Sequence, residues 1–145
     1  MLKGVAGPLE MFALDWRDTA VFPVAVEIVE EQRIDPLPCQ SRVRIGRLET
    51  HEGQTANDLV VAHPDVSLSQ RISRWHSELE MRPGGYLLRA VTPASTEVDG
   101  YALAEGEARP IRPGSTAVLG KVLTLNFLSA ADTADHTLHT SADTR

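Results

Sequence analysis

The chain has 145 residues, which is enough for one domain with flanking segments. Hydrophobic residues make up 42% of it, and no apolar run approaches the roughly 20 residues that a membrane-spanning helix needs. The formal net charge of −6 argues against nucleic acid or an anionic membrane as the main partner. An anionic ligand would therefore need a local cluster of cations.

The N-terminus and the cysteine content indicate the compartment. Residues 1–10 contain one lysine and no long apolar core, so we expect no secretory signal. Cys39 is the only cysteine, which excludes an intramolecular disulfide and a cysteine-based metal cage. His51 and His63 have no partners at the spacing of a metal site. We therefore expect a cytoplasmic protein without a metal or another cofactor.

Alternation of apolar and polar residues with a period of two dominates residues 21–128, as in half-buried strands. In segment 21–30 one face holds Phe22, Val24, Val26 and Ile28. Later segments repeat the pattern with Val43 and Ile45, Leu59 and Val61, Leu79 and Met81, Tyr86 and Leu88, and Leu123, Leu125 and Phe127. Turn signals separate the later runs, at Pro83-Gly84-Gly85, Asp99-Gly100, Glu105-Gly106, Pro113-Gly114 and Gly120. Many short strands with such turns predict an all-β sandwich or barrel.

Other segments lack the strand pattern. Residues 31–40, 50–56 and 62–72 are interpreted as polar loops, and no helical period appears in the middle of the chain. Residues 9–16 fit a short helix, a strand or an unpacked arm. Residues 130–145 are rich in Thr, Ser, Asp and Ala, which is typical of a flexible tail. We therefore expect an N-terminal arm at 1–19, one β-domain at 20–129 and a tail at 130–145.

Two short motifs carry the chemistry. Gly46-Arg47 follows one predicted strand, and Ser73-Arg74-Trp75-His76 precedes another. Together they place two arginines, a hydroxyl and an imidazole on loops. That is the set of groups needed to hold a phosphate, which on a phosphorylated side chain near pH 7 carries about −1.5 to −2 charges and three acceptor oxygens. Guanidinium groups suit such a ligand because they stay charged and offer paired planar donors.

The ordered set of motifs resembles the forkhead-associated (FHA) domain, a phosphothreonine-binding β-sandwich. The matching positions are Gly46-Arg47, Asn57-Asp58, Ser73-Arg74-Trp75-His76, the loop from Thr92 to Gly100, and Gly120. The resemblance covers roughly residues 21–128. It implies a sandwich of two twisted antiparallel sheets. It also implies an adaptor that binds a phosphothreonine segment of a partner, such as a Ser/Thr kinase or its substrate.

The resemblance further implies a role for each phosphopeptide-binding residue. Arg47 would be the chief phosphate ligand, and Ser73 would donate its hydroxyl to a second oxygen. Arg74 would offer its main-chain N–H, its side chain, or both. Arg71 lies where family members often select the peptide residue three places after the phosphothreonine, and an arginine there suits an acidic residue. Thr92 belongs to the same set.

A second group would brace the loops. Gly46 and His76 belong to it through the resemblance, and Thr92 or Thr96 would tie down the loop that contains them. Trp75 either covers the edge of the core or lies exposed beside the peptide, and the alternation from Leu79 favours the inward position.

This chain departs from the family pattern at two places. Ala94 replaces the family's asparagine, which hydrogen-bonds the peptide backbone, and alanine has no side-chain donor. Ser95 falls at the family's glycine, and loop 62–72 is longer than usual. These features favour an alternative function, a scaffold that binds unmodified protein or self-associates.

Plainer interpretations remain beside these. Arg47 can also be interpreted as an ordinary surface arginine. Ser73 can be interpreted as a turn residue and His76 as a structural histidine. The motifs of nucleophile-elbow hydrolases, P-loop nucleotide-binding proteins and zinc peptidases are absent, so we expect no enzyme. The tail offers Thr133, Thr137, Thr140 and Thr144 as phosphoacceptors for regulation in cis, although an extension without a role is the simpler reading.

Overall fold

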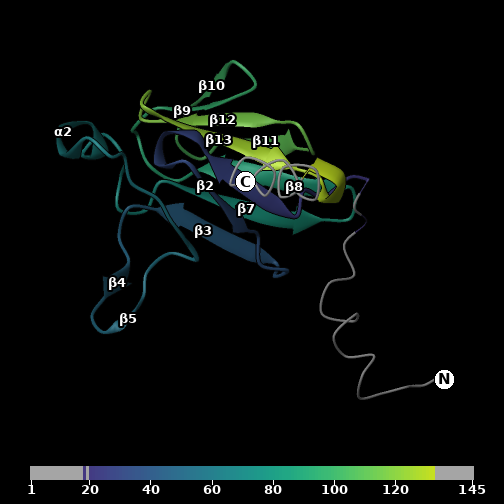
Figure 1. Ribbon diagram of the computed structural model, residues 1–145, viewed down its shortest axis with the longest axis horizontal. Helices are drawn as coiled ribbons and strands as arrows, with labels where there is room; N and C mark the ends of the chain where they lie inside the picture. Colours follow the sequence, from purple (N-terminus) through teal and green to yellow (C-terminus); the bar gives the residue numbers. More distant parts are fainter. Residues whose placement is uncertain (1–17, 19, 133–145) are drawn as a thin grey trace, which may run out of the picture.

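Two sheets packed face to face form the described part of the protein (Figure 1). The computed structural model describes residue 18 and residues 20–132, so most of the predicted arm and tail, with residues 9–16, lie outside it. One sheet has the order β10-β9-β12-β13-β1-β2, with bounds Tyr101–Leu103, Thr96–Val98, Thr116–Leu119, Leu123–Leu128, Ala25–Ile28 and Arg33–Pro36. The other has the order β11-β8-β7-β3-β6, with bounds Ala108–Ile111, Gly85–Ala90, Ser77–Arg82, Arg42–Gly46 and Leu59–Val60.

Small elements lie outside the two sheets, and residues 130–132, the first of the predicted tail, are helical. A hairpin joins β4 (Thr50–His51) to β5 (Gln54–Thr55), a 3-10 turn spans Val29–Glu31, and helix α2 spans Val66–Ser69. The predicted all-β sandwich is confirmed. Its pairings are antiparallel except for the parallel pair β3–β6.

The predicted alternation places the core between the sheets. Side chains from both inner faces are buried, including Val26, Ile28, Val43, Ile45, Leu79, Leu88, Leu123, Leu125 and Phe127. Phe22 and Tyr86 meet edge to face with ring centroids 5.2 Å apart. Burying such apolar surface is the main favourable term in folding, so these alternating residues determine which face of each strand turns inward.

Several predicted boundaries were wrong. The first strand starts at Ala25 rather than near Val21, because Val21 and Phe22 instead form a turn whose N–H groups donate to the Asp18 carbonyl. The predicted loop 31–40 contains β2, an edge strand without apolar alternation because its side chains are half-buried or exposed. Loop 50–56 contains the exposed β4–β5 hairpin, and loop 62–72 contains α2.

Helix α2 forms through its cap rather than through periodicity. The Asp65 carboxylate accepts hydrogen bonds from the backbone N–H groups of Ser67 and Leu68, at 2.9 and 3.4 Å. A side chain at this position satisfies N–H groups that one helical turn leaves unpaired. Four residues are too few to show a helical period in a sequence.

Arginines close both open seams of the sandwich. At the β2–β6 seam, the Arg33 guanidinium donates to the Val60 carbonyl, and Glu31 accepts from the Ala62 N–H at 2.7 Å. Arg33 also pairs with Asp35 at 3.0 Å. At the β10–β11 seam, the Arg109 guanidinium lies 3.8 Å from the centre of the Tyr101 ring. Each arginine thereby joins the edge strands of different sheets.

We expect Arg33→Ala to lower the free energy of unfolding by about 1–2 kcal/mol, because a charge-assisted hydrogen bond between the sheets is lost at a half-exposed position. Urea denaturation measures this change. Arg42→Ala is the control, since Arg42 forms only an exposed pair with Glu78. Equal stability of the two variants would contradict a role for Arg33 at the seam.

Candidate functional site

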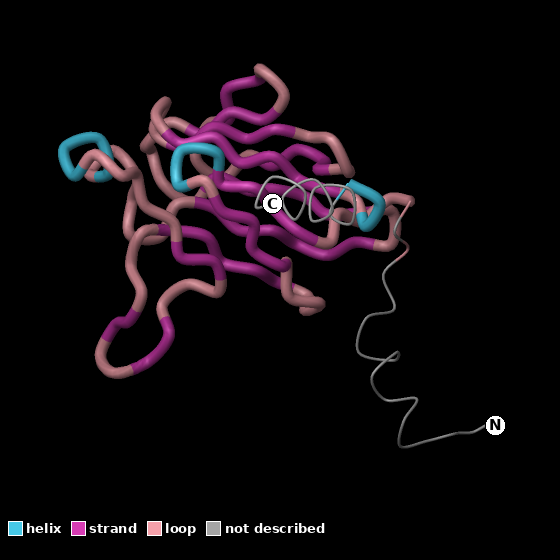
Figure 2. Tube along the Cα trace, in the orientation of Figure 1, coloured by secondary structure: helices cyan, strands magenta, loops and turns pink. Residues whose placement is uncertain are grey.

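Strand register places connections from both sheets at one end of the sandwich, and four of them concern the site. They are residues 47–49 after β3, 61–76 between β6 and β7, 91–95 between β8 and β9, and 120–122 between β12 and β13. We call them the loop end. It lies on the left in Figure 1, where α2 and the β4–β5 hairpin also project. Loops form most of this end in Figure 2.

The end of β3 lies directly against the β6–β7 connection. A Cβ built on Gly46 would lie 2.1 Å from the Arg74 carbonyl oxygen, so only glycine permits this approach. Backbone hydrogen bonds continue it, from Arg47 N–H to the Ser73 carbonyl at 3.0 Å and from Leu48 N–H to the Arg74 carbonyl at 3.2 Å. The two predicted motifs are therefore joined through their backbones.

Asn57 fastens the same junction, and the sequence assigned it no site role. Its side-chain Nδ2 donates to the carbonyls of Leu48 and Arg74, at 2.8 and 2.7 Å, and the residue is 2% exposed. The signal in the sequence was the Asn57-Asp58 pair ahead of a short strand. It marked a motif without showing that the amide would bridge two loops.

His76 connects the β6–β7 connection to the β8–β9 connection from a buried position. Its Nδ1 lies 3.0 Å from the Ser73 N–H, and its Nε2 lies 2.8 Å from the Ser95 carbonyl oxygen. Nδ1 therefore accepts and Nε2–H donates, which only the neutral imidazole with a proton on Nε2 can do. Burial lowers the pKa of His76 below 6.5, an effect that the hydrogen bond to Ser95 partly offsets.

The hydroxyls of Ser73 and Thr92 meet across the same two connections, with their oxygens 2.9 Å apart. Thr92 Oγ1 also accepts from the Ala94 N–H at 3.4 Å. Thr96 differs from the prediction, because it is the first residue of β9 and its buried hydroxyl has no hydrogen-bond partner among the described residues. The hydrogen bonds that were expected of Thr96 are instead made by the Thr92 hydroxyl, to Ser73, and by the Ser95 carbonyl, to His76.

Cations without ion pairs gather at the loop end. Within residues 20–132, no carboxylate pairs with the side chains of Arg47, Arg71, Arg74 or Lys121. Of the arginines elsewhere in that range, five are paired, and Arg109 and Arg112 are not. Arg47 donates its Nε to the Ile72 carbonyl at 2.9 Å, which leaves its two terminal amino groups unused by described residues. Arg74 is exposed, and neither its backbone N–H nor its guanidinium bonds to a described residue.

Gly120 brings the β12–β13 turn against Arg71. A Cβ on Gly120 would lie 2.4 Å from the Arg71 carbonyl oxygen, and its φ of +62° also favours glycine. The Gly120 N–H donates to the Ser95 carbonyl at 2.8 Å. Lys121, which is exposed, directly follows Gly120 in the chain, and Gly120 is the residue that packs against Arg71.

Trp75 does not turn toward the core as the alternation from Leu79 predicted. Its side chain lies at the surface with 38% exposure, and its Nε1–H donates to the Ala56 carbonyl at 3.1 Å. The His51 ring meets it edge to face, with centroids 5.2 Å apart. β7 begins only at Ser77, so strand alternation does not extend back to Trp75.

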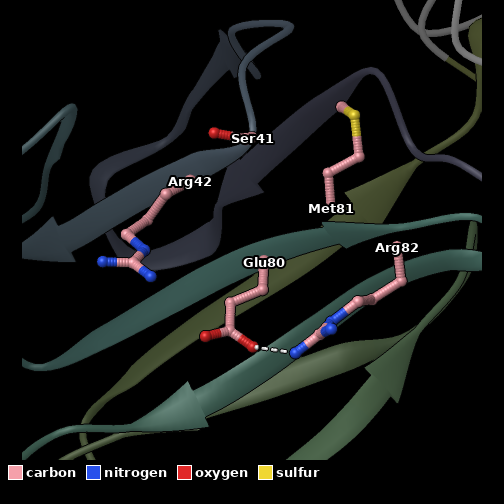
Figure 3. Close-up of a pocket in the computed structure, with 5 residues that line it drawn as sticks. All are labelled: Ser41, Arg42, Glu80, Met81 and Arg82. Carbon is pink, nitrogen blue, oxygen red and sulfur yellow. Dashed lines mark hydrogen bonds and ion pairs between the residues drawn. The ribbon is translucent and has the colours of Figure 1, made fainter.

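A separate cavity lies at the opposite end of β3 and β7. Its lining residues are Ser41, Arg42, Glu80, Met81 and Arg82 (Figure 3). Glu80 hydrogen-bonds Arg89 and Arg82, at 3.1 Å each, and these contacts, that to Arg89 first, hold the pKa of Glu80 below its ordinary value. Both arginines of this cavity are already paired, so we assign it no anion.

The described residues contain no cluster of three or more His, Cys, Asp or Glu side chains able to hold a metal ion. In that same part of the chain, no helix is both long and apolar enough to cross a membrane.

No protein-family model and no curated protein matches this chain, but solved structures share its architecture. An FHA domain from an Arabidopsis thaliana hypothetical protein is 20% identical with a TM-score of 0.58, over 80% of this chain and 95% of that one. The N-terminal FHA domain of S. cerevisiae Rad53p, solved with a phosphothreonine peptide, is 17% identical with a TM-score of 0.56, over 74% and 93%. The chain folds as a forkhead-associated domain.

A third FHA-fold neighbour is longer. Mycobacterium tuberculosis EmbR, solved with a low-affinity phosphopeptide, is 17% identical with a TM-score of 0.54 over 73% of this chain. The match covers 24% of EmbR, so the present chain spans about a quarter of that protein.

We expect Gly46→Ala to destabilise the FHA fold by about 1–3 kcal/mol, because the new methyl group would overlap the Arg74 carbonyl and separate β3 from the β6–β7 connection. Thermal or urea unfolding measures this change. Gly84→Ala is the matched control, since nothing lies within 4 Å of a Cβ there. A Gly46→Ala variant as stable as Gly84→Ala would refute the close approach.

We expect acid to weaken the fold through His76. Because its folded pKa lies below the ordinary 6.5, its contribution to stability is complete above about pH 6.5 and is lost as the pH falls from there through the folded pKa. Urea unfolding at pH 7.5 and 5.5 should show a smaller pH-dependent loss in His76→Gln than in the wild type. His51→Gln, at an exposed histidine, should keep the wild-type loss. Identical pH dependence in all three proteins would contradict the assignment.

Proposed function

We propose that this FHA-fold chain is an adaptor that binds a phosphothreonine segment of a partner protein at the loop end. The partner would be a Ser/Thr kinase, a kinase substrate, or a protein of an assembly controlled by such phosphorylation. The chain would act in the cytoplasm as a binding module and not as an enzyme. Arg47, Ser73 and Arg74 would contact the phosphate.

The observation that carries the proposal is the anchored and otherwise unpaired guanidinium of Arg47. Its Nε bond to the Ile72 carbonyl fixes the plane of the group, while its terminal amino groups stay available for phosphate oxygens. A guanidinium group that is already held in place before binding loses less side-chain entropy when the ligand binds. Among the described residues no carboxylate forms an ion pair with Arg47, so no such pair must break first.

Ser73 would complete the phosphate contacts. If the Thr92 hydroxyl donates to Ser73 Oγ across their 2.9 Å contact, the Ser73 proton is free to point to a phosphate oxygen. The backbone N–H of Arg74, which bonds to no described residue, adds another donor of the kind that binds anions well. In a chain of net charge −6, this cluster would attract phosphate only at short range.

Arg71 supports a finer proposal about specificity. It is exposed and unpaired, and its backbone is held against Gly120. We assign it to an acidic residue on the C-terminal side of the phosphothreonine, at the third position suggested by the family resemblance.

Ala94 favours a second candidate function, a scaffold for unmodified protein. Its methyl group offers no hydrogen bond to a peptide backbone, and its N–H is already directed to Thr92. The loss of one such bond costs typically about 0.5–1.5 kcal/mol, which weakens a phosphopeptide contact without excluding it. The phosphate contacts proposed above do not involve Ala94, so we prefer the first function.

We expect Arg47→Ala to abolish binding of phosphothreonine peptides and to leave the fold intact. Calorimetric titration with matched phosphothreonine, phosphoserine and unmodified threonine peptide libraries measures this change. Arg42→Ala is the matched control, because it removes an exposed arginine at the opposite end of β3. Unchanged affinity in Arg47→Ala would overturn the assignment of the phosphate site. Binding that survives phosphatase treatment of the partner would favour the scaffold.

A further inference from the structure

Trp75 is a large aromatic side chain held at the surface beside the proposed phosphate ligands. It directly follows Arg74, whose carbonyl is fixed by Leu48 and Asn57. It is 38% exposed, whereas the proposed phosphate ligands that precede it in the chain, Ser73 and Arg74, are polar. An isolated exposed aromatic requires no explanation, but one that adjoins a cationic cluster and is fixed by two contacts does.

The two contacts fix the indole and satisfy its polar atom. The Nε1–H donates to the Ala56 carbonyl at 3.1 Å, and the His51 ring packs against it at 80° from the hairpin side. The His51 Nε2 lies 3.4 Å from the Glu52 carboxylate, so that polar group is engaged as well. What the indole still offers to solvent is hydrocarbon, which favours an apolar contact over a polar one.

We propose that Trp75, supported by His51, is a specificity-determining surface for an aliphatic or aromatic side chain flanking the phosphothreonine in the same partner segment. The proposal rests on the proposed function, because its occupant is covalently joined to the phosphorylated residue. Continuity with Arg74 makes this occupant the favoured one, since Trp75 is the next residue in the chain after a proposed phosphate ligand. A rigid aromatic beside a charged anchor is typical of residues that dominate binding energy.

A purely structural role would leave different features. Trp75 would then serve only to tie the β4–β5 hairpin to the β6–β7 connection, and its removal would change stability without changing any preference among phosphothreonine peptides. Its exposed fraction of 38% equals that of Val29 and is lower than that of Tyr101, at 57%. Tyr101 lies at the edge of the other sheet, where Arg109 covers it, and so provides a matched aromatic control.

The experiment titrates the full chain with phosphothreonine peptides of otherwise alanine sequence, in which leucine occupies each flanking position in turn. We expect leucine at one position to bind about tenfold more tightly than alanine there. Trp75→Ala should lose this preference and keep the affinity of the all-alanine peptide, whereas Trp75→Phe should retain part of it and Tyr101→Ala all of it. In a Trp16→Phe background, Trp75 is the only tryptophan, so its fluorescence should shift with the preferred peptide and not with the all-alanine one.

The fluorescence measurement does not depend on the folding of Trp75→Ala. Phosphothreonine binding without any flanking preference, or a preference unchanged in Trp75→Ala, would overturn the inference and leave the phosphate site standing. Absence of binding to every phosphothreonine peptide would overturn both, and would then also appear as no difference between the wild type and Arg47→Ala.

Discussion

The contact on which the site depends is the meeting of two backbones at Gly46 and Arg74. No side chain separates them, so the end of β3 and the β6–β7 connection exchange hydrogen bonds as neighbouring strands do. Asn57 then fastens the junction from the side with two further bonds. Because backbone atoms have no rotamers, the positions of Arg47 and Ser73 relative to one another follow from the fold itself.

A second layer of constraint comes from His76, which acts through its hydrogen bonds and not through charge. Its Nδ1 accepts a hydrogen bond from the Ser73 N–H, and its Nε2–H donates to the Ser95 carbonyl. These bonds hold the two connections together, with the hydroxyls of Ser73 and Thr92 within hydrogen-bond distance. A charged imidazole would need a proton on both nitrogens and would oppose the Ser73 N–H. The positive charges of the site therefore lie on exposed or half-buried arginines, and the buried brace stays neutral.

The features that could be predicted from the sequence are those that depend on the burial of apolar side chains. Val43, Ile45, Leu79 and Phe127 alternate because one face of each strand is buried, so the sandwich and its core could be anticipated. Elements that are stabilised by single polar contacts could not be predicted from the sequence. The edge strand β2 has no apolar face to reveal it, α2 depends on the Asp65 cap, and Asn57 acts on residues distant in the chain. Trp75 was misplaced because alternation was extended one loop too far, to a residue whose position depends on Ala56 and His51.

The register of β1 with β13 also brings the first and last strands of the sandwich together at one place. Ala25 pairs with Leu128, and the Val24 N–H donates to the Leu128 carbonyl, so the described chain enters and leaves side by side. This place is at the turn between β7 and β8, where the Val21 carbonyl adjoins Gly85, and the sandwich separates it from the loop end. The start of β1 and the end of β13 thus lie on the opposite side of the sandwich from Arg47 and Trp75, so the chain that leads into and out of the fold does not cross the loop end there.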